Sequence, residues 1–148
     1  MTMSDPISLV LKGKRQIFSV TPDISVFDAM KVMAEKDIGA LLVMTGRDLV
    51  GIMSERDYAR KVVLHGRSSR DTLVREIMSS PPITTGIEST VDDCMAIMTR
   101  HRIRHLPVVD GPQVVGVVSI GDMVNWIISS HEKTIDHLQQ YIAGAYPA

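Results

Sequence analysis

The chain has 148 residues, of which 45% are hydrophobic and 22% are charged, so the composition excludes an intrinsically disordered protein. A net charge of -1 gives no overall attraction to a polyanion, which disfavours nucleic acid as a partner. The single cysteine, Cys94, excludes an internal disulfide, and we expect a cytoplasmic protein. No apolar run approaches the roughly 20 residues that cross a bilayer, so we expect no membrane association.

An internal repeat organises the chain. The segment Val26 to Asp57 aligns without a gap on Val91 to Asp122, at an offset of 91 - 26 = 65 residues. Over the wider window 17–58, twelve of 42 positions are identical in the two copies. This agreement in a single register indicates a duplication. Because separate units of about 60 residues bury little surface, we expect the two repeats to share a core.

Repeat 1 is predicted to start with a short strand at residues 16–20 and a helix. Ser25 is a candidate N-cap for that helix. The apolar residues that follow have helical spacing and predict its buried face: Val26, Ala29, Met30 and Met33.

A hairpin and a second helix complete repeat 1. The apolar runs 40–44 and 49–53 are separated by Gly46, which predicts a β-hairpin. Ser54 then opens a helix that ends before Gly66.

Repeat 2 is predicted to have the same order of elements. A strand at 83–85 precedes a helix capped by Thr90, and the runs 106–109 and 114–118 flank Gly111. The last helix is expected from Asp122 to about Ile142, with apolar members at Met123, Trp126, Ile127, Ile135, Leu138 and Ile142. The expected limits are 8–66 for repeat 1, 67–71 for a polar linker, 72–130 for repeat 2 and 131–148 for a C-terminal extension.

Three segments carry a family resemblance. Residues 51–57 read GIMSERD, residues 105–110 read HLPVVD and residues 116–122 read GVVSIGD. Their order, spacing and duplication resemble the cystathionine-β-synthase (CBS) domain family over about residues 8–130. The chain is similar to the stand-alone version of that family, because the sequence shows no catalytic or transporter domain.

The resemblance implies an α/β fold in which two tandem βαββα CBS repeats pack sheet to sheet with pseudo-two-fold symmetry. It also implies a regulatory Bateman module that commonly forms a homodimer. Family members bind AMP, ATP, NAD(H) or S-adenosylmethionine in clefts between the repeats. We expect AMP here, with NAD(H) or ATP as alternatives, no catalytic cofactor, and a regulated protein that the sequence does not name.

Two Ser-x-x-Asp pairs are the strongest candidate site residues. Ser54 with Asp57, and Ser119 with Asp122, each stand where a helix follows a buried strand. From spacing alone the capping box is the favoured interpretation. The resemblance instead implies that each aspartate accepts hydrogen bonds from a ribose diol, for which a carboxylate has the acceptors.

Basic residues are the candidates for a phosphate. The resemblance implies that Arg56 and Gly121 face the clefts and that Arg104 and His105 hold phosphate. The alternative for this basic run is a solvated helix end with cations near the negative end of the dipole. Repeat 1 has Gly39 at the position of Arg104, so the two sites are expected to differ in their affinity for phosphate.

The family's crossed arrangement implies two sets of residues for adenine. One set is expected beside Asp122: Gly13, Gln16 and Phe18. The other is expected beside Asp57: Met78, Pro81 and Ile83. The alternative for each residue is ordinary core packing or loop structure.

Other functions are less well supported. His101 and His105 lack further ligands at zinc-like spacing, so no metal is expected. Cys94 falls on the buried face of its helix and is expected to be a packed residue. A purely structural dimerisation module remains an alternative, and so does an enzyme that acts on a nucleotide, although no acid/base or nucleophile constellation is present.

Overall fold

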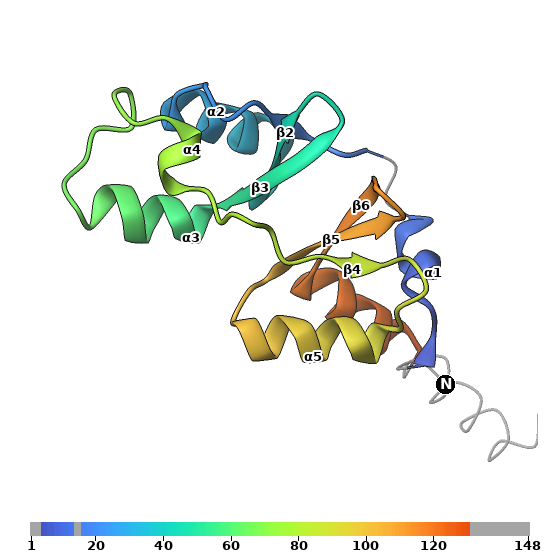
Figure 1. The fold of residues 1–148 in the computed structure, drawn as a ribbon. Coiled ribbons are helices and arrows are strands. Elements are labelled where there is room, and N and C mark those ends of the chain that lie inside the picture. Colours follow the sequence, from blue (N-terminus) through green and yellow to red (C-terminus); the bar gives the residue numbers. More distant parts are fainter. Residues whose placement is uncertain (1–3, 14–15, 131–148) are drawn as a thin grey trace, which may run out of the picture. The chain divides into compact units, whose positions relative to one another are not determined.

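The structure is a computed structural model that describes residues 4–13 and 16–130. It contains two three-stranded sheets with the strand orders β1-β2-β3 and β4-β5-β6, and helices beside them (Figure 1). In both sheets the first two strands are parallel. The predicted α/β class is therefore confirmed.

Repeat 1 follows the predicted order. β1 (Ser19–Val20) precedes α2 (Val26–Lys36), and β2 (Ala40–Thr45) pairs antiparallel with β3 (Asp48–Ser54). The hydroxyl of Ser25 accepts a hydrogen bond from the Asp28 amide at 3.1 Å, which confirms the predicted N-cap. β1 is shorter than the predicted strand.

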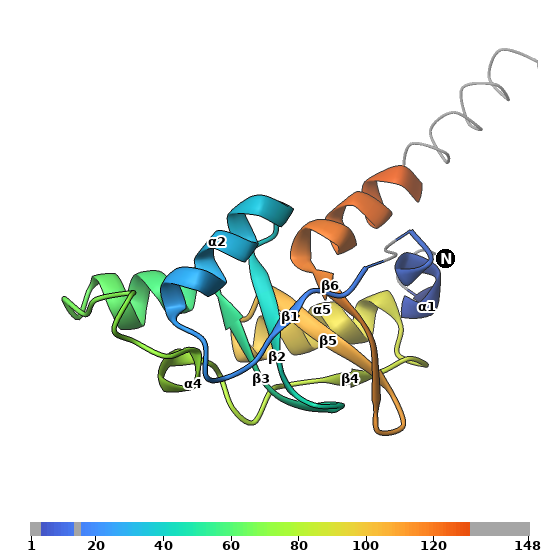
Figure 2. The same ribbon diagram turned by 90° about the horizontal axis from the view of Figure 1, so that it is seen from above.

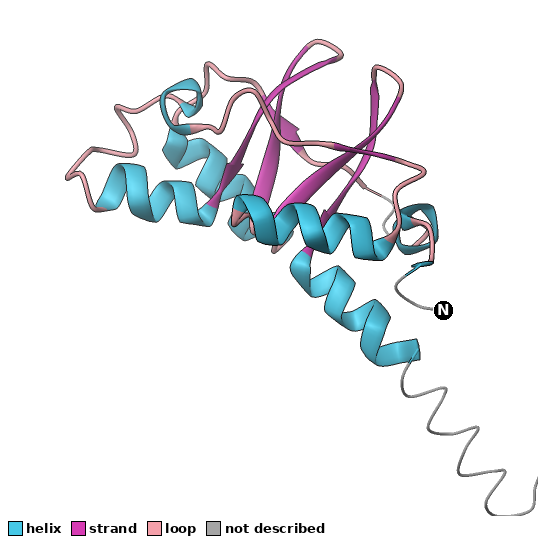
Figure 3. Cartoon of the chain, turned by 60° about the horizontal axis from the view of Figure 1, so that its bottom comes forward, coloured by secondary structure: helices cyan, strands magenta, loops and turns pink. Residues whose placement is uncertain are grey.

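Repeat 2 has the same elements. β4 (Thr85–Gly86) precedes α5 (Val91–His101), β5 (His105–Asp110) and β6 (Gln113–Ser119). Figure 3 shows the two strand pairs that end in turns as separate magenta hairpins. The turn glycines of the hairpins, Gly46 and Gly111, have φ of 62° and 60°, a conformation that disfavours other residues.

The helix after β3 differs from the prediction. It starts as α3 (Glu55–Tyr58) and continues as a π-helical turn, η2 (Ala59–Val63), in which the Leu64 amide donates to the Ala59 carbonyl at 3.0 Å. Gly66, with φ of 66°, follows it as predicted. In repeat 2 the matching residues 120–130 are α-helical, and the part predicted beyond them, with Ile135, Leu138 and Ile142, lies outside the described residues.

Two short helices were not predicted. α1 (Ile7–Leu11) and α4 (Val74–Ile77) lie in what we term the lead-in segments, residues 5–13 and 72–83, which precede the first strands of the two repeats. Residue 6 forms an isolated bridge with Thr90, and Leu73 forms the equivalent bridge with Ser25. α1, which precedes the first strand of repeat 1, is therefore attached to α5 of repeat 2. α4, which precedes the first strand of repeat 2, is attached to α2 of repeat 1.

This exchange explains how the chain divides into two compact units. One unit combines residues 1–15, 87–106 and 118–148, and the other combines 16–86 and 107–117. Figure 2 shows α1 (blue) beside α5 (yellow) and the helix at residues 120–130 (orange), although repeat 1 separates α1 from both in sequence. α1 thus belongs with repeat 2, and α4 with repeat 1.

Repeat 1 has a continuous apolar core. Ile77 of α4 is fully buried in it together with residues of α2, β2, β3 and η2. The members are Val26, Ala29, Met33, Leu41, Val43, Met53, Val62, Val74 and Ile77. The predicted buried face of α2 is confirmed, with Met30 packed at the edge of the core.

The predicted linker 67–71 is fastened to α2. The Phe27 amide donates to the Ser69 carbonyl at 2.9 Å, and the Arg70 guanidinium lies 3.9 Å from the centre of the Phe27 ring. The expected domain limits stay a prediction. None of the helices in residues 4–13 and 16–130 is long and apolar enough to cross a membrane.

Candidate nucleotide site

The first Ser-x-x-Asp pair forms a complete capping box. The Ser54 amide donates to Asp57 Oδ2 at 2.9 Å, and the Asp57 amide donates to Ser54 Oγ at 3.3 Å. The Ser54 hydroxyl also donates to Asp57 Oδ2, at 3.1 Å. The capping interpretation is thus confirmed for this pair, and it fixes the direction of the carboxylate.

Asp57 has a cationic neighbour that was not predicted. Lys61 Nζ lies 3.1 Å from Asp57 Oδ1 and donates to the Ile77 carbonyl at 2.8 Å. The lysine side chain is 43% exposed, whereas the aspartate side chain is 14% exposed. The available signal was the spacing of four residues between an acid and a base on one helix.

The second lead-in segment runs along β3 beside this box. Ile52 and Ser79 exchange two backbone hydrogen bonds of 3.1 and 2.9 Å. A Cβ on Gly51 would lie 2.6 Å from Met78 Sδ, so glycine is needed for this close approach. Because Lys61 links Ile77 to Asp57, the structure brings Met78 to the Asp57 end of repeat 1.

The other two residues expected beside Asp57 follow along the same segment. Pro81 is exposed and Ile83 is half-buried. The Ser80 hydroxyl, just before Pro81, donates to the Val50 carbonyl at 2.7 Å. The role of Met78, Pro81 and Ile83 toward adenine stays a prediction.

The second Ser-x-x-Asp pair repeats the geometry. The Ser119 amide donates to Asp122 Oδ2 at 2.7 Å, and the Asp122 amide donates to Ser119 Oγ at 3.1 Å. The Ile120 amide donates to the Arg104 carbonyl at 2.8 Å, which places Arg104 next to the start of this helix. In repeat 1 the Glu55 amide donates to the Gly39 carbonyl at 3.0 Å in the same way.

The predicted phosphate residues lie in or next to the first turns of these helices along the backbone. Arg104 is exposed and His105, the first residue of β5, is half-buried. Gly121 is exposed in the first turn of the helix, and Arg56 is half-buried in the matching turn of repeat 1. An exposed guanidinium group near a helix start is suited to an anionic ligand.

The three residues expected beside Asp122 are divided between the units. Gly13 lies in the same unit as Asp122, whereas Gln16 and Phe18 belong to the unit of repeat 1. Phe18 packs against the core of repeat 1, and Lys36 Nζ lies 5.4 Å from the centre of its ring. Their expected position beside Asp122 stays a prediction.

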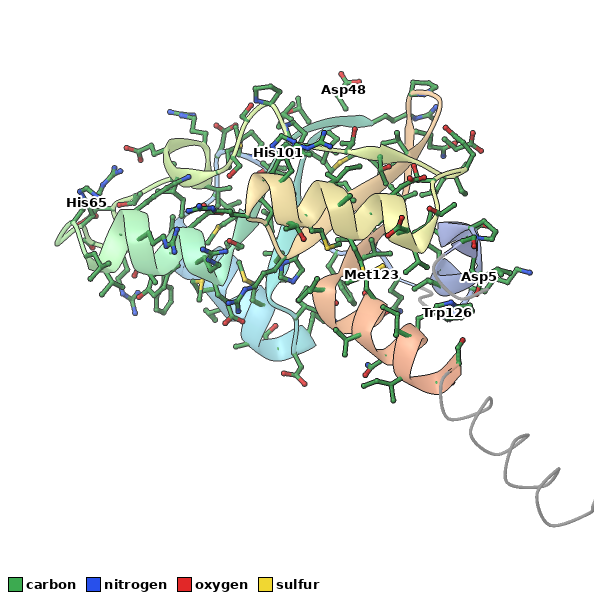
Figure 4. The ribbon with its side chains drawn as sticks, turned by 90° about the horizontal axis from the view of Figure 1, so that it is seen from below. Asp5, Asp48, His65, His101, Met123 and Trp126 are labelled. Carbon is green, nitrogen blue, oxygen red and sulfur yellow. The ribbon has the colours of Figure 1, made fainter. Side chains whose placement is uncertain are left out.

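A polar contact fastens α1 to the last helix. Trp126 Nε1 donates to Asp5 Oδ2 at 2.9 Å, and Figure 4 shows the two side chains next to each other. Trp126 occupies the position that matches Lys61, since 61 + 65 = 126. Lys61 and Trp126 therefore each bind a lead-in segment. Lys61 donates to a backbone carbonyl, and Trp126 donates to a carboxylate.

Neither a metal site nor a reactive thiol is found in the described part of the chain. No group of three or more His, Cys, Asp or Glu residues there could hold a metal ion. Desolvation by burial raises the pKa of the Cys94 thiol to about 11, and the charge of Asp93 adds to the effect. Cys94 is therefore a packed residue rather than a nucleophile.

Comparison with known proteins agrees with this architecture. A model of the CBS domain family matches the chain twice, over residues 13–64 and 74–129. The chain belongs to the CBS domain family. The two CBS matches fall on repeats 1 and 2, which identifies the 65-residue duplication as a pair of CBS repeats.

Several CBS proteins are similar over most of the chain. The CBS domain-containing protein CBSX3, mitochondrial, of Arabidopsis thaliana is 41% identical over 153 residues, which span 97% of this chain and 74% of the relative. A CBS-domain protein structure from Burkholderia ambifaria is 51% identical, with a TM-score of 0.81, and the match covers 84% of this chain and 94% of that one. A CBS domain protein from Pyrobaculum aerophilum, complexed with AMP, is 29% identical, with a TM-score of 0.71 and a coverage of 79% and 88%.

Proposed function

We propose that this CBS pair is a sensor that binds adenine nucleotides, with AMP as the first ligand and NAD(H) or ATP as alternatives. The observation that carries the proposal is the pair of carboxylates, Asp57 and Asp122, each held by a capping box where a helix follows a buried strand. The AMP complex of the similar Pyrobaculum aerophilum protein supports this ligand class.

The chemistry of each group matches one part of AMP. An ionised carboxylate accepts the two donors of a ribose diol. Arg104 provides a cation and His105 an imidazole for the phosphate beside the helix that starts at residue 120, whose N-terminal amides also favour an anion. Met78 offers an apolar, polarisable surface to adenine at the Asp57 end of repeat 1.

The two sites are expected to have unequal affinities. The helix that carries Asp122 starts next to Arg104, whose carbonyl accepts from the Ile120 amide, whereas repeat 1 has Gly39 at the position of Arg104. A hydrogen bond to a charged group contributes about 1.5 to 3 kcal/mol, so we expect AMP to bind roughly tenfold or more tightly at Asp122.

A regulatory role fits better than catalysis. The described residues near Asp57 and Asp122 contain capping and charge contacts, without a nucleophile paired to a base. We propose that the output is a change in a regulated protein. The expected cytoplasmic location stays part of this proposal.

A homodimer is part of the same proposal. Val124 and Ile128, one turn apart on the last helix, are 43% and 49% exposed. The sequence also predicts a second subunit from Trp126, Ile127, Ile135 and Leu138; the first two are half-buried, and the last two lie outside the described residues. An exposed apolar pair at this spacing is suited to a second subunit, because it forms a stripe along one helix face.

Calorimetry with AMP on the wild type, Asp57→Asn and Asp122→Asn tests the proposed function. Asparagine keeps an acceptor for the capping box and removes the charge, so the fold is preserved. We expect Asp122→Asn to remove the tight phase and Asp57→Asn to leave it intact. Absence of binding by the wild type to AMP, NAD(H) and ATP would favour the structural dimerisation module instead.

A further inference from the structure

The carboxylate of Asp57 is largely occupied by donors of the chain itself. Oδ2 accepts from the Ser54 amide at 2.9 Å and from the Ser54 hydroxyl at 3.1 Å, and Oδ1 faces Lys61 Nζ at 3.1 Å. An ionised carboxylate has about four acceptor positions. A ribose diol brings two donors, so both can bind only when one of these three donors leaves.

Lys61 is the donor that leaves most easily. The Ser54 amide is fixed by the backbone at the helix start, and the Ser54 hydroxyl is also held by the Asp57 amide at 3.3 Å. Lys61 reaches Asp57 with a long, flexible side chain that is 43% exposed. An ion pair whose cation is flexible and partly solvent-exposed adds little stability, so its rupture opposes ligand binding only weakly.

A second contact of Lys61 connects Asp57 to the lead-in segment. The same ammonium donates to the Ile77 carbonyl at 2.8 Å, at the end of α4. Ile77 is fully buried in the core of repeat 1, and the next residue, Met78, lies against Gly51 of β3. Movement of Lys61 away from Asp57 therefore changes the surroundings of the Ile77–Met78 peptide.

Repeat 2 has a different residue at this position. Trp126 stands where repeat 1 has Lys61, and its indole donates to Asp5. A tryptophan carries no charge that could compete for a carboxylate. Trp126 therefore gives repeat 2 no equivalent of the contact between Lys61 and Asp57.

We infer that Lys61 is a positioning residue that closes the Asp57 site, and that a ligand with a ribose diol must displace it from Asp57 in order to bind. This inference rests on the proposed function. It adds that the ion pair of Lys61 and Asp57 opposes ligand binding at repeat 1. It also adds that displacement of Lys61 by the ligand alters the second lead-in segment, residues 72–83.

The test uses adenosine, because an uncharged ligand forms no ion pair of its own with the site. Adenosine is titrated into the full chain while the ¹³C-labelled methyl group of Met78 is followed by NMR. We expect Lys61→Met to bind adenosine about two- to fivefold more tightly than the wild type, which corresponds to the weak ion pair that is lost. Arg60→Met, which removes an exposed cation one residue away, is the matched control and should bind as the wild type does.

A salt series on the wild type gives a second readout that requires no variant. Salt screens an exposed ion pair, so the affinity of the wild type for adenosine should rise between low ionic strength and about 0.5 M salt. The affinity of Lys61→Met should change much less. A purely structural role for Lys61 would not produce this difference.

The outcomes separate the two proposals. Equal or weaker adenosine binding by Lys61→Met, or an equal gain in Arg60→Met, overturns the role of Lys61 and leaves the nucleotide site intact. If adenosine shifts the Met78 methyl signal in neither protein, the nucleotide site at Asp57 is itself wrong, and the inference about Lys61 falls with it.

Discussion

Single residues in this chain serve structure and the candidate site together. Asp57 and Asp122 cap helices, and the same carboxylates are the proposed ribose acceptors. Spacing predicted the caps, because a capping box is a local pattern of four residues. Spacing could not predict that Lys61 also reaches Ile77, since that contact depends on how α4 packs.

Gly51 is the residue at which close packing has the clearest measurable consequence. In Gly51→Ala the new Cβ would lie 2.6 Å from Met78 Sδ and 3.0 Å from the Ser79 carbonyl oxygen. The methionine can move, but the Ser79 backbone is held to Ile52 by two hydrogen bonds. We expect Gly51→Ala to lower the free energy of unfolding by about 1 to 3 kcal/mol, measured by urea denaturation.

The control for that measurement is Gly121→Ala. Its Cβ would lie 3.5 Å from Ser119 Oγ, an ordinary contact, and alanine favours a helix over glycine by up to about 1 kcal/mol. Unchanged or higher stability is expected. Equal losses in both variants would mean that the approach of Met78 and Ser79 to β3 does not require glycine at residue 51.

At the scale of elements, the sequence predicted the parts that have a period or a local signal. α2, α5 and the two hairpins were found because their apolar spacing and turn glycines repeat at a constant offset. α1 and α4 have five and four residues, which is too short to show helical periodicity. The π-helical turn η2 likewise has no sequence signal in this chain.

α4 makes the stability of repeat 1 depend on pH. Glu76 accepts from the Leu73 amide at 2.7 Å and from Arg67 at 2.6 Å. These two contacts hold the pKa of Glu76 below its usual value of 4.5 in the folded chain. A carboxyl group with a lowered folded pKa stabilises the fold above its unfolded pKa, and this stabilisation is lost as the pH falls through the folded value.

We therefore expect thermal unfolding of the wild type to show a steeper loss of stability with falling pH, below about pH 4.5, than Glu76→Gln does. Glutamine does not titrate, so it removes the contribution of Glu76 at all pH values. Glu35→Gln, which removes an exposed carboxylate from α2, serves as the control. Parallel pH profiles for the wild type and Glu76→Gln would show that the contacts of Glu76 do not stabilise α4.

For the whole molecule, the proposed homodimer gives the most direct prediction. Sedimentation velocity at micromolar concentration should show a dimer for the wild type and a monomer for Ile128→Glu, because a buried unpaired carboxylate opposes association. Ile17→Glu adds the same charge at another exposed apolar residue, 44% exposed, and should stay dimeric. A monomeric wild type, with or without AMP, would contradict the dimer.

The exchange of lead-in helices also bears on the origin of the duplication. α1 is fastened to the start of α5, and α4 to the start of α2, so each repeat is completed by a helix that precedes the other. An ancestral chain with one repeat and one such helix would have been complete only as a swapped pair of identical molecules. Gene fusion would then have turned an exchange between two polypeptides into one within a single polypeptide, where association no longer depends on concentration.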